Sequence, residues 1–151
     1  MDRYVALVGD CNRTALNGLW TALKNKKFEP DELLIILDEH SESIDDLEKD
    51  LHEILKSYGL DCPVKSKIFS EVEDVRHLIG ENSGEENGLK ALDISSASKY
   101  ITAKVLMSSK SDMFDHIFCL EVKGDEGRPL PTIENNKVKL HDLKSEEEGG
   151  I

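Results

Sequence analysis

Two short and almost uninterrupted apolar runs constrain the fold of this chain more than any other feature. The first covers residues 4–9 (YVALVG) and the second covers residues 33–37 (LLIIL). A strand exposed to water on one face alternates apolar and polar residues, whereas a strand covered on both faces stays apolar throughout. Both runs therefore predict strands at the centre of a parallel sheet, which occurs almost only in α/β proteins.

Segments whose apolar residues repeat at helical spacing separate the predicted strands. Leu16, Leu19 and Leu23, for example, fall on one face of a helix that follows the first strand. Residues 64–69 alternate instead, which predicts a strand nearer an edge of the sheet. The remaining predicted elements are helices over residues 44–58, 72–79 and 101–107, the last bearing Ile101, Val105, Leu106 and Met107, and strands over residues 89–94 and 116–122.

Polar residues and glycines mark where the first two helices begin and end. Asp10, Asn12 and Thr14 are candidate caps for the start of the first helix, because their side chains can accept hydrogen bonds from its unpaired N–H groups. Ser41 and Ser43 hold the same position before the second helix, and Gly59 follows its last apolar residue. We therefore expect both helices to be well delimited.

The C-terminal part of the chain lacks the strand–helix alternation. Two short apolar segments, residues 130–133 and 138–140, flank Asn135 and Asn136. Asparagine tolerates positive φ, so this pattern predicts a β-hairpin. Residues 80–88 are rich in glycine and predict a mobile loop.

Together these elements predict an α/β, Rossmann-like fold. It has a mostly parallel central sheet with helices on both faces and a C-terminal β-hairpin. The length of 151 residues fits one domain, which we assign to residues 1–142. Residues 143–151 predict a disordered acidic tail.

Charge and cysteine content exclude several classes of function. The chain has 31 acidic and 19 basic residues and a formal net charge of −12, which opposes binding to long nucleic acids but not to a small anionic ligand. No apolar run approaches the roughly 18 residues of a membrane span, and the N-terminus is no signal peptide. The three cysteines are widely spaced, which favours a reducing, cytoplasmic location.

Two loops at the ends of the first and fourth strands are the candidate ligand site. In open α/β sheets, ligands bind beyond the carboxyl ends of the strands where the strand order reverses. The topology places that point between strand 4–9 and strand 89–94. Both loops lead into helix N-termini, which bind anions through free N–H groups, and they carry hydroxyls and one lysine suited to phosphate. The lining residues predicted from them are Gly9, Asp10, Cys11, Asn12, Arg13, Thr14, Ser95, Ser96, Ala97, Ser98 and Lys99.

Familiar nucleotide-binding motifs are absent from these loops. The first loop has a single glycine where a dinucleotide fingerprint has three, and no Walker A lysine pattern occurs. A nicotinamide or flavin enzyme is therefore disfavoured, and we expect no cofactor and no metal.

The two loops resemble those of CARF (CRISPR-associated Rossmann fold) domains from type III CRISPR ancillary proteins. Residues 9–16 (GDCNRTAL) are similar to the family's first ligand loop, and residues 92–99 (LDISSASK) to its motif Asp–hydrophobic–Thr/Ser–Gly–Gly–Thr–Lys. Ser96 and Ala97 replace the two glycines, and Ser98 replaces threonine, which adds side-chain atoms where the family has bare backbone. The element order matches over residues 3–142, as in a stand-alone CARF protein.

This resemblance implies a function in antiviral defence. CARF domains form two-fold homodimers in which both copies of the loops bind one cyclic oligoadenylate, and cyclic tetra-adenylate is the favoured ring here. A two-fold pocket suits a ring of even symmetry. The resemblance implies phosphate contacts at the serines and at Lys99. Asn12 and Asp38, which ends the second strand, are candidates for the adenine edges.

Three alternatives for the activity stay open. As a metal-independent ring nuclease, the protein would cleave the ring to a product with a 2′,3′-cyclic phosphate. Lys99 would then stabilise charge on phosphorus, and Thr14 or Asn12 would orient the attacking 2′-OH. As a non-catalytic interaction module, it would regulate a separate effector or transcription partner. A generic nucleotide-binding domain is the third alternative.

One fragment outside the loops has the spacing of a metal nuclease. Glu121 and Lys123 give an ExK pattern, with Asp112 or Asp115 upstream as a possible metal ligand. The same residues also suit the polar end of an ordinary strand.

Overall fold

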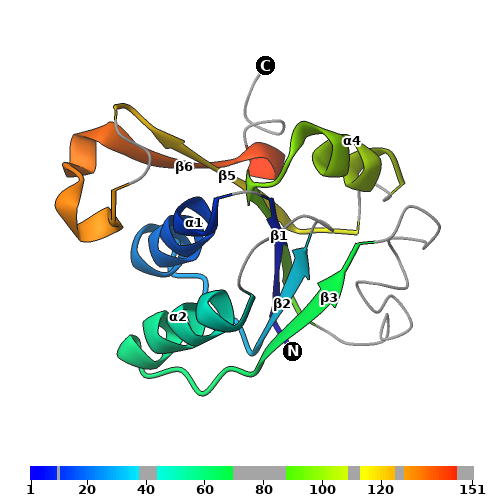
Figure 1. The fold of residues 1–151 in the computed structure, drawn as a ribbon, viewed down its shortest axis with the longest axis horizontal. Coiled ribbons are helices and arrows are strands. Elements are labelled where there is room, and N and C mark those ends of the chain that lie inside the picture. Colours follow the sequence, from blue (N-terminus) through cyan, green and yellow to red (C-terminus); the bar gives the residue numbers. More distant parts are fainter. Residues whose placement is uncertain (10, 38–43, 70–87, 109–112, 125–127, 146–151) are drawn as a thin grey trace.

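The computed structural model describes residues 1–9, 11–37, 44–69, 88–108, 113–124 and 128–145. Their strands form one six-stranded sheet in the order β3-β2-β1-β4-β5-β6 (Figure 1). The strands are β1 (Arg3–Val8), β2 (Glu32–Leu37), β3 (Val64–Ile68), β4 (Lys90–Ser96), β5 (His116–Val122) and β6 (Val138–Asp142). The α-helices are α1 (Asn12–Asn25), α2 (Ile44–Ser57) and α4 (Lys99–Ser108).

Strand β1 is the centre of the sheet, as its apolar sequence predicts. It pairs in parallel with β2 on one side and with β4 on the other. Residues Tyr4 to Val8 are buried, because helices cover both faces. The predicted edge strand is β3, which pairs with β2 at one end of the strand order among the described residues and is largely exposed. The predicted α/β, Rossmann-like fold class is confirmed.

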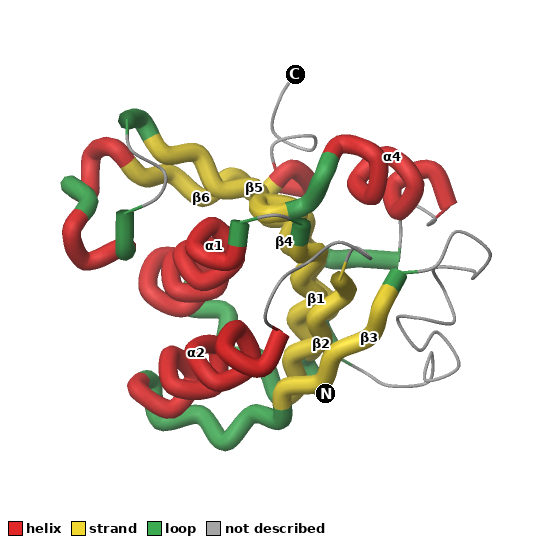
Figure 2. Tube along the Cα trace, in the orientation of Figure 1, coloured by secondary structure: helices red, strands yellow, loops and turns green. Residues whose placement is uncertain are grey.

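The two faces of the sheet are covered by different helices. Helices α1 and α2 lie on one face and α4 lies on the other (Figures 1 and 2). Alternate residues of β1 face opposite ways, so Tyr4, Ala6 and Val8 pack under α1 and α2. Val5 and Leu7 pack with Ile101 and Val105 of α4 in a second cluster.

Helix α2 follows its amphipathic pattern closely. Leu47, Leu51 and Leu55 are buried at intervals of one turn, and the opposite side of the helix is charged. The helix ends at Ser57, and Gly59 follows two residues later with a φ of +75°, in the left-handed region that favours glycine. This C-terminal glycine confirms the sequence prediction.

Helix α4 departs from its predicted packing. Ile101 and Val105 are in the core, but Leu106 is 40% exposed and Met107 is 86% exposed. Tyr100 on the same helix is also exposed. The apolar residues of the helix do not share one side, so some of them point away from the core that Ile101 and Val105 join.

Two further predictions were wrong in detail. Leu130–Thr132 form a 3₁₀ turn and not a strand, and the partner of β6 is β5, in antiparallel register. The C-terminal antiparallel pair therefore consists of β5 and β6. The N-cap of α1 is Cys11, whose side chain makes no capping hydrogen bond, and not Asn12 or Thr14. The third predicted cap, Asp10, lies outside the described residues. The predicted helix over 72–79, residues 80–87 of the predicted loop, the caps Ser41 and Ser43, and residues 146–151 of the tail lie outside the described residues.

Candidate functional site

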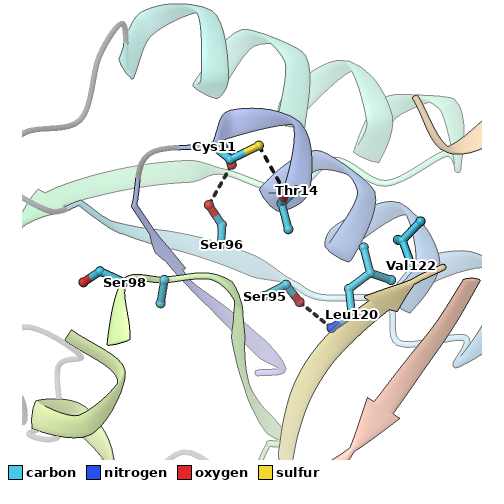
Figure 3. A pocket seen from close by; sticks show the side chains of 8 residues that line it. Cys11, Thr14, Ser95, Ser96, Ser98, Leu120 and Val122 are labelled. Atoms are coloured by element: carbon cyan, nitrogen blue, oxygen red, sulfur yellow. Dashed lines mark hydrogen bonds between the residues drawn. The ribbon is translucent and has the colours of Figure 1, made fainter. Parts of the chain in front are cut away.

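The two predicted loops are joined directly by hydrogen bonds. The N–H of Gly9 donates to the carbonyl oxygen of Ser96 at 2.9 Å. The Ser96 hydroxyl donates to the carbonyl oxygen of Cys11 at 2.7 Å (Figure 3). A Cβ atom at position 9 would lie 2.7 Å from the Ser96 carbonyl oxygen, so only glycine permits this approach. We call residues 9, 11–14 and 95–98 the loop cluster.

A β-bulge at the end of β4 shapes the second loop. Ala6 pairs with Asp93, but Val8 pairs with Ser96, so β4 carries one more residue than β1 between these positions. A bulge bends a strand and re-aims its side chains, and bulges are enriched beside functional sites. Here the bulge falls at Ile94 and Ser95, at the start of the loop.

The buried side chain of Asp93 anchors this bulge. One of its carboxylate oxygens accepts hydrogen bonds from the Ser95 N–H, at 2.8 Å, and from the Ser95 hydroxyl, and the other accepts from the Tyr4 hydroxyl. Asp93 is only 2% exposed. Burial raises the pKa of this carboxyl above its ordinary value of 3.8, and the hydrogen bonds from Ser95 and Tyr4 oppose part of the rise. The network holds Ser95 in one orientation.

A pocket opens where β4 and β5 part. Their parallel pairing ends at Asp93 and Phe118, and β5 continues beyond it. The Leu120 N–H then donates to the Ser95 hydroxyl at 2.8 Å instead of to a strand carbonyl (Figure 3). The space between the loop cluster and β5 has a volume of about 360 Å³. Its lining residues are Cys11, Thr14, Ser95, Ser96, Ala97, Ser98, Leu120 and Val122.

Ser98 serves as the N-cap of α4. Its hydroxyl oxygen accepts a hydrogen bond from the N–H of Ile101 at 3.2 Å. The N-terminus of α4 thereby begins at the pocket, with Lys99 exposed as its first residue. The positive end of the helix dipole favours an anion at this position.

The structure brings half of the predicted residues to one pocket. Gly9 shapes the cluster without lining the space. Asn12 and Lys99 do not line it either. Asp10 and Asp38 lie outside the described residues.

Arg13 belongs to a different groove. It lies between α1 and α2 beside Trp20, Asp50 and Glu53, in a space of about 420 Å³. Successive residues at a helix N-terminus point in directions about 100° apart, so Thr14 and Arg13 face different neighbours. Arg13 therefore does not line the first pocket.

Sequence reasoning missed Leu120 and Val122, which form the apolar wall of the pocket. They belong to the part of β5 that continues beyond its pairing with β4. Recognising this requires the register between β4 and β5, which a sequence does not provide.

The nuclease-like fragment on β5 does not assemble a metal site in the described residues. Asp115 precedes the first residue of β5, and Glu121 lies near the other end of the strand. Glu121 instead pairs with His141 of β6 at 3.5 Å. No group of three His, Cys, Asp or Glu side chains within the described ranges is placed to hold a metal ion.

The helices of the described segments are also too short or too polar to cross a membrane.

Strand order, parallel register and helix placement together define a Rossmann-like α/β fold, and comparison with solved structures finds a similar fold. The chain is similar to the structure of Enterococcus italicus Csm6 bound to cyclic hexa-2'-fluoro-hexa-dAMP. The TM-score is 0.58 and the sequence identity is 13%. The match covers 99% of this chain and 44% of that chain, so this chain spans less than half of Csm6. No family model and no curated protein sequence matches it.

Proposed function

We propose that this protein binds a cyclic oligoadenylate in CRISPR antiviral defence, with cyclic tetra-adenylate as the favoured ring. The observation that carries the proposal is the pocket of the loop cluster, which opens at the strand-order reversal of a CARF-like fold. The structural neighbour Csm6 holds a cyclic hexanucleotide analogue. Ring phosphates would contact the Ser98 hydroxyl and the N-terminus of α4, with Lys99 as counter-charge.

The size of the pocket supports a homodimer as the binding form. A volume of about 360 Å³ lies at the low end of pockets that hold one drug-sized molecule. A ring of four nucleotides would extend well beyond it. Two copies related by a two-fold axis would supply two such pockets to one ring.

Helix α4 is the surface on which the second copy would dock. It begins at the pocket, and its exposed side carries Tyr100, Leu106 and Met107. It contains no acidic residue, in a chain with a net charge of −12, so two copies meet here with less repulsion than elsewhere. Lys99 and Lys104 of the two copies would repel each other until an anionic ring lies between them. We therefore expect the ring to strengthen the dimer.

The test of binding is incubation of the purified protein with cyclic tri-, tetra- and hexa-adenylate in EDTA, followed by mass spectrometry of the bound and free pools. An intact ring retained at one per dimer supports a sensor or interaction module. A linear product with a cyclic phosphate supports a metal-independent ring nuclease. Retention or cleavage of none of the rings contradicts the proposal.

Residue roles in a ring nuclease can be separated by variants. Lys99→Ala removes the charge beside the phosphates and should slow cleavage at least about tenfold, the scale of one lost electrostatic contact in a transition state. Thr14→Ala and Asn12→Ala test the orientation of the 2′-OH. Lys56→Ala, on the distant α2, is the matched control and should leave the rate unchanged.

The dimer is tested by light scattering after size-exclusion chromatography. Met107→Glu places a charge on the proposed interface and should shift the protein to monomer, whereas Lys56→Ala should not. If Met107→Glu leaves the oligomeric state unchanged, the docking surface is refuted.

A further inference from the structure

The hydrogen bonds inside the pocket determine which of its hydroxyl groups can donate a hydrogen bond to a ligand and which can only accept one. The Ser96 hydroxyl donates its only hydrogen to the carbonyl oxygen of Cys11, at 2.7 Å. A carbonyl oxygen can only accept, so this assignment of donor and acceptor is unambiguous. Towards the pocket, Ser96 therefore offers lone pairs and no hydrogen.

The Ser95 hydroxyl can also only accept a hydrogen bond from a ligand, but for a different reason. Its hydroxyl accepts a hydrogen bond from the Leu120 N–H at 2.8 Å and donates its hydrogen to Asp93. Asp93 is buried and receives a further hydrogen bond from the Tyr4 hydroxyl, so its position is set by the core and not by a ligand. Turning the Ser95 hydrogen towards a ligand would leave a buried carboxyl oxygen with one donor fewer.

The Ser98 hydroxyl, in contrast, can donate a hydrogen bond to a ligand. Its oxygen accepts from the N–H of Ile101, which leaves its hydrogen available to donate. In Figure 3, Ser98 lies on the far side of Ser95 and Ser96 from the apolar residues Leu120 and Val122. The pocket thus has a donor end at Ser98 and an acceptor region, next to an aliphatic wall, at Ser95 and Ser96.

An anion and a purine base suit these two regions differently. A phosphate oxygen is an acceptor, so it fits the donor end at Ser98 and is repelled by the lone pairs of Ser95 and Ser96. The acceptor region requires a neutral donor, and the adjacent wall suits a flat, weakly polar ring. The amino group of adenine meets both requirements. Guanine and hypoxanthine present a carbonyl oxygen at the same place and do not.

We propose that Ser95 and Ser96 form a base-specificity site that accepts a hydrogen bond from the exocyclic amino group of adenine, with the Asp93–Tyr4 network as its positioning support. The proposal deepens the proposed function and rests on it. It assigns to these two serines the base and not the phosphate, and it leaves the phosphate to Ser98 and the start of α4.

The experiment compares the affinity of cyclic tetra-adenylate with that of the same ring built from inosine, which exchanges the amino group for a carbonyl oxygen. The intact protein should bind the adenosine ring at least about tenfold more tightly, the scale expected when a buried polar group loses its partner. Ser96→Ala should remove most of that preference, and Ser96→Thr, which keeps the hydroxyl, should retain it. Ser98→Ala is the matched control and should weaken both rings equally.

The outcomes separate this inference from the function it rests on. Equal affinity of the intact protein for the two rings overturns the inference and leaves ring binding standing. An undiminished preference in Ser96→Ala, with a melting temperature close to that of the intact protein, also overturns it. Binding of neither ring contradicts the proposed function and this inference together.

Discussion

The α1–α2 face of the sheet and the loop cluster are held together by different forces. On the α1–α2 face, large apolar side chains such as Leu19, Leu51 and Leu55 are almost completely buried. In the loop cluster, small residues bring backbones close, and hydrogen bonds such as that from Gly9 to Ser96 hold them. Apolar burial is non-directional and sums over area, whereas each hydrogen bond depends on one geometry. The first region should therefore determine stability and the second should determine binding.

The largest expected effect is on the apolar face. Leu51→Ala removes a side chain that is 1% exposed and should lower the free energy of unfolding by about 2–5 kcal/mol, because it leaves a cavity. Urea denaturation measures this loss. Lys49→Ala, on the exposed side of the same helix, should change it by no more than about 0.5 kcal/mol. Under conditions where Leu51→Ala stays folded, its ring affinity should equal that of the intact protein, and a large loss would erase the contrast between the regions.

The second effect is on the loop cluster. Gly9→Ala places a Cβ atom 2.7 Å from the Ser96 carbonyl oxygen, so the two loops must move apart. We expect ring affinity to fall at least about tenfold, with a stability loss of about 1–3 kcal/mol. Isothermal titration calorimetry and urea denaturation measure the two quantities.

Gly59→Ala is the control that sharpens this test. It strains a residue with φ of +75° at the end of α2, far from the pocket, and should cost about 1 kcal/mol of stability without loss of affinity. If both glycine variants lose ring affinity to a similar extent, the loss results from lower stability and not from a change in the loop cluster.

The third effect is a pH dependence that originates in Asp93, the buried residue of β4 that holds Ser95 of the loop cluster. Because burial raises the folded-state pKa of Asp93 above 3.8, the folded protein binds a proton in a pH range where the unfolded chain does not. The free energy of unfolding contributed by this group therefore falls as pH rises from about 4 through the folded-state pKa. Asp93→Asn cannot ionise, so its stability relative to the intact protein should increase over that range. Urea denaturation between pH 4 and pH 7 measures the difference, and a constant difference would contradict it.

The smallest effect leaves stability unchanged and concerns the reactivity of one cysteine thiol in each region. Cys11 is exposed in the loop cluster, whereas Cys62 is buried in the core beneath α2. Burial, with smaller contributions from nearby carboxylates, raises the pKa of the Cys62 thiol to about 11. A thiol reagent at pH 8 should modify Cys11 at least about a hundredfold faster, since the thiolate is the reactive form. Cys11→Ser should remove the fast phase, and its persistence would contradict this assignment.

Much of the fold could be predicted because its signals are local. The apolar runs of β1 and β2 need no partner to indicate burial, and the leucines of α2 define its buried face by spacing alone. The failures arose where partners decide structure. Residues 130–133 have the apolar character of a strand, but β6 pairs with β5, and Leu130 to Thr132 form a 3₁₀ turn. The exposure of Met107 likewise depends on how far the core extends beneath α4.

The sequence by itself determined the class of fold, the position of the strand-order reversal and the two loops that meet there. Hydrophobic periodicity and loop composition express these features within a few neighbouring residues. Only the tertiary structure decided which loop residues face the pocket, that β5 supplies its apolar wall, and which way the serine hydroxyls donate. Those properties depend on strand register, on one bulge in β4 and on the buried Asp93, which bring together atoms that are far apart along the chain.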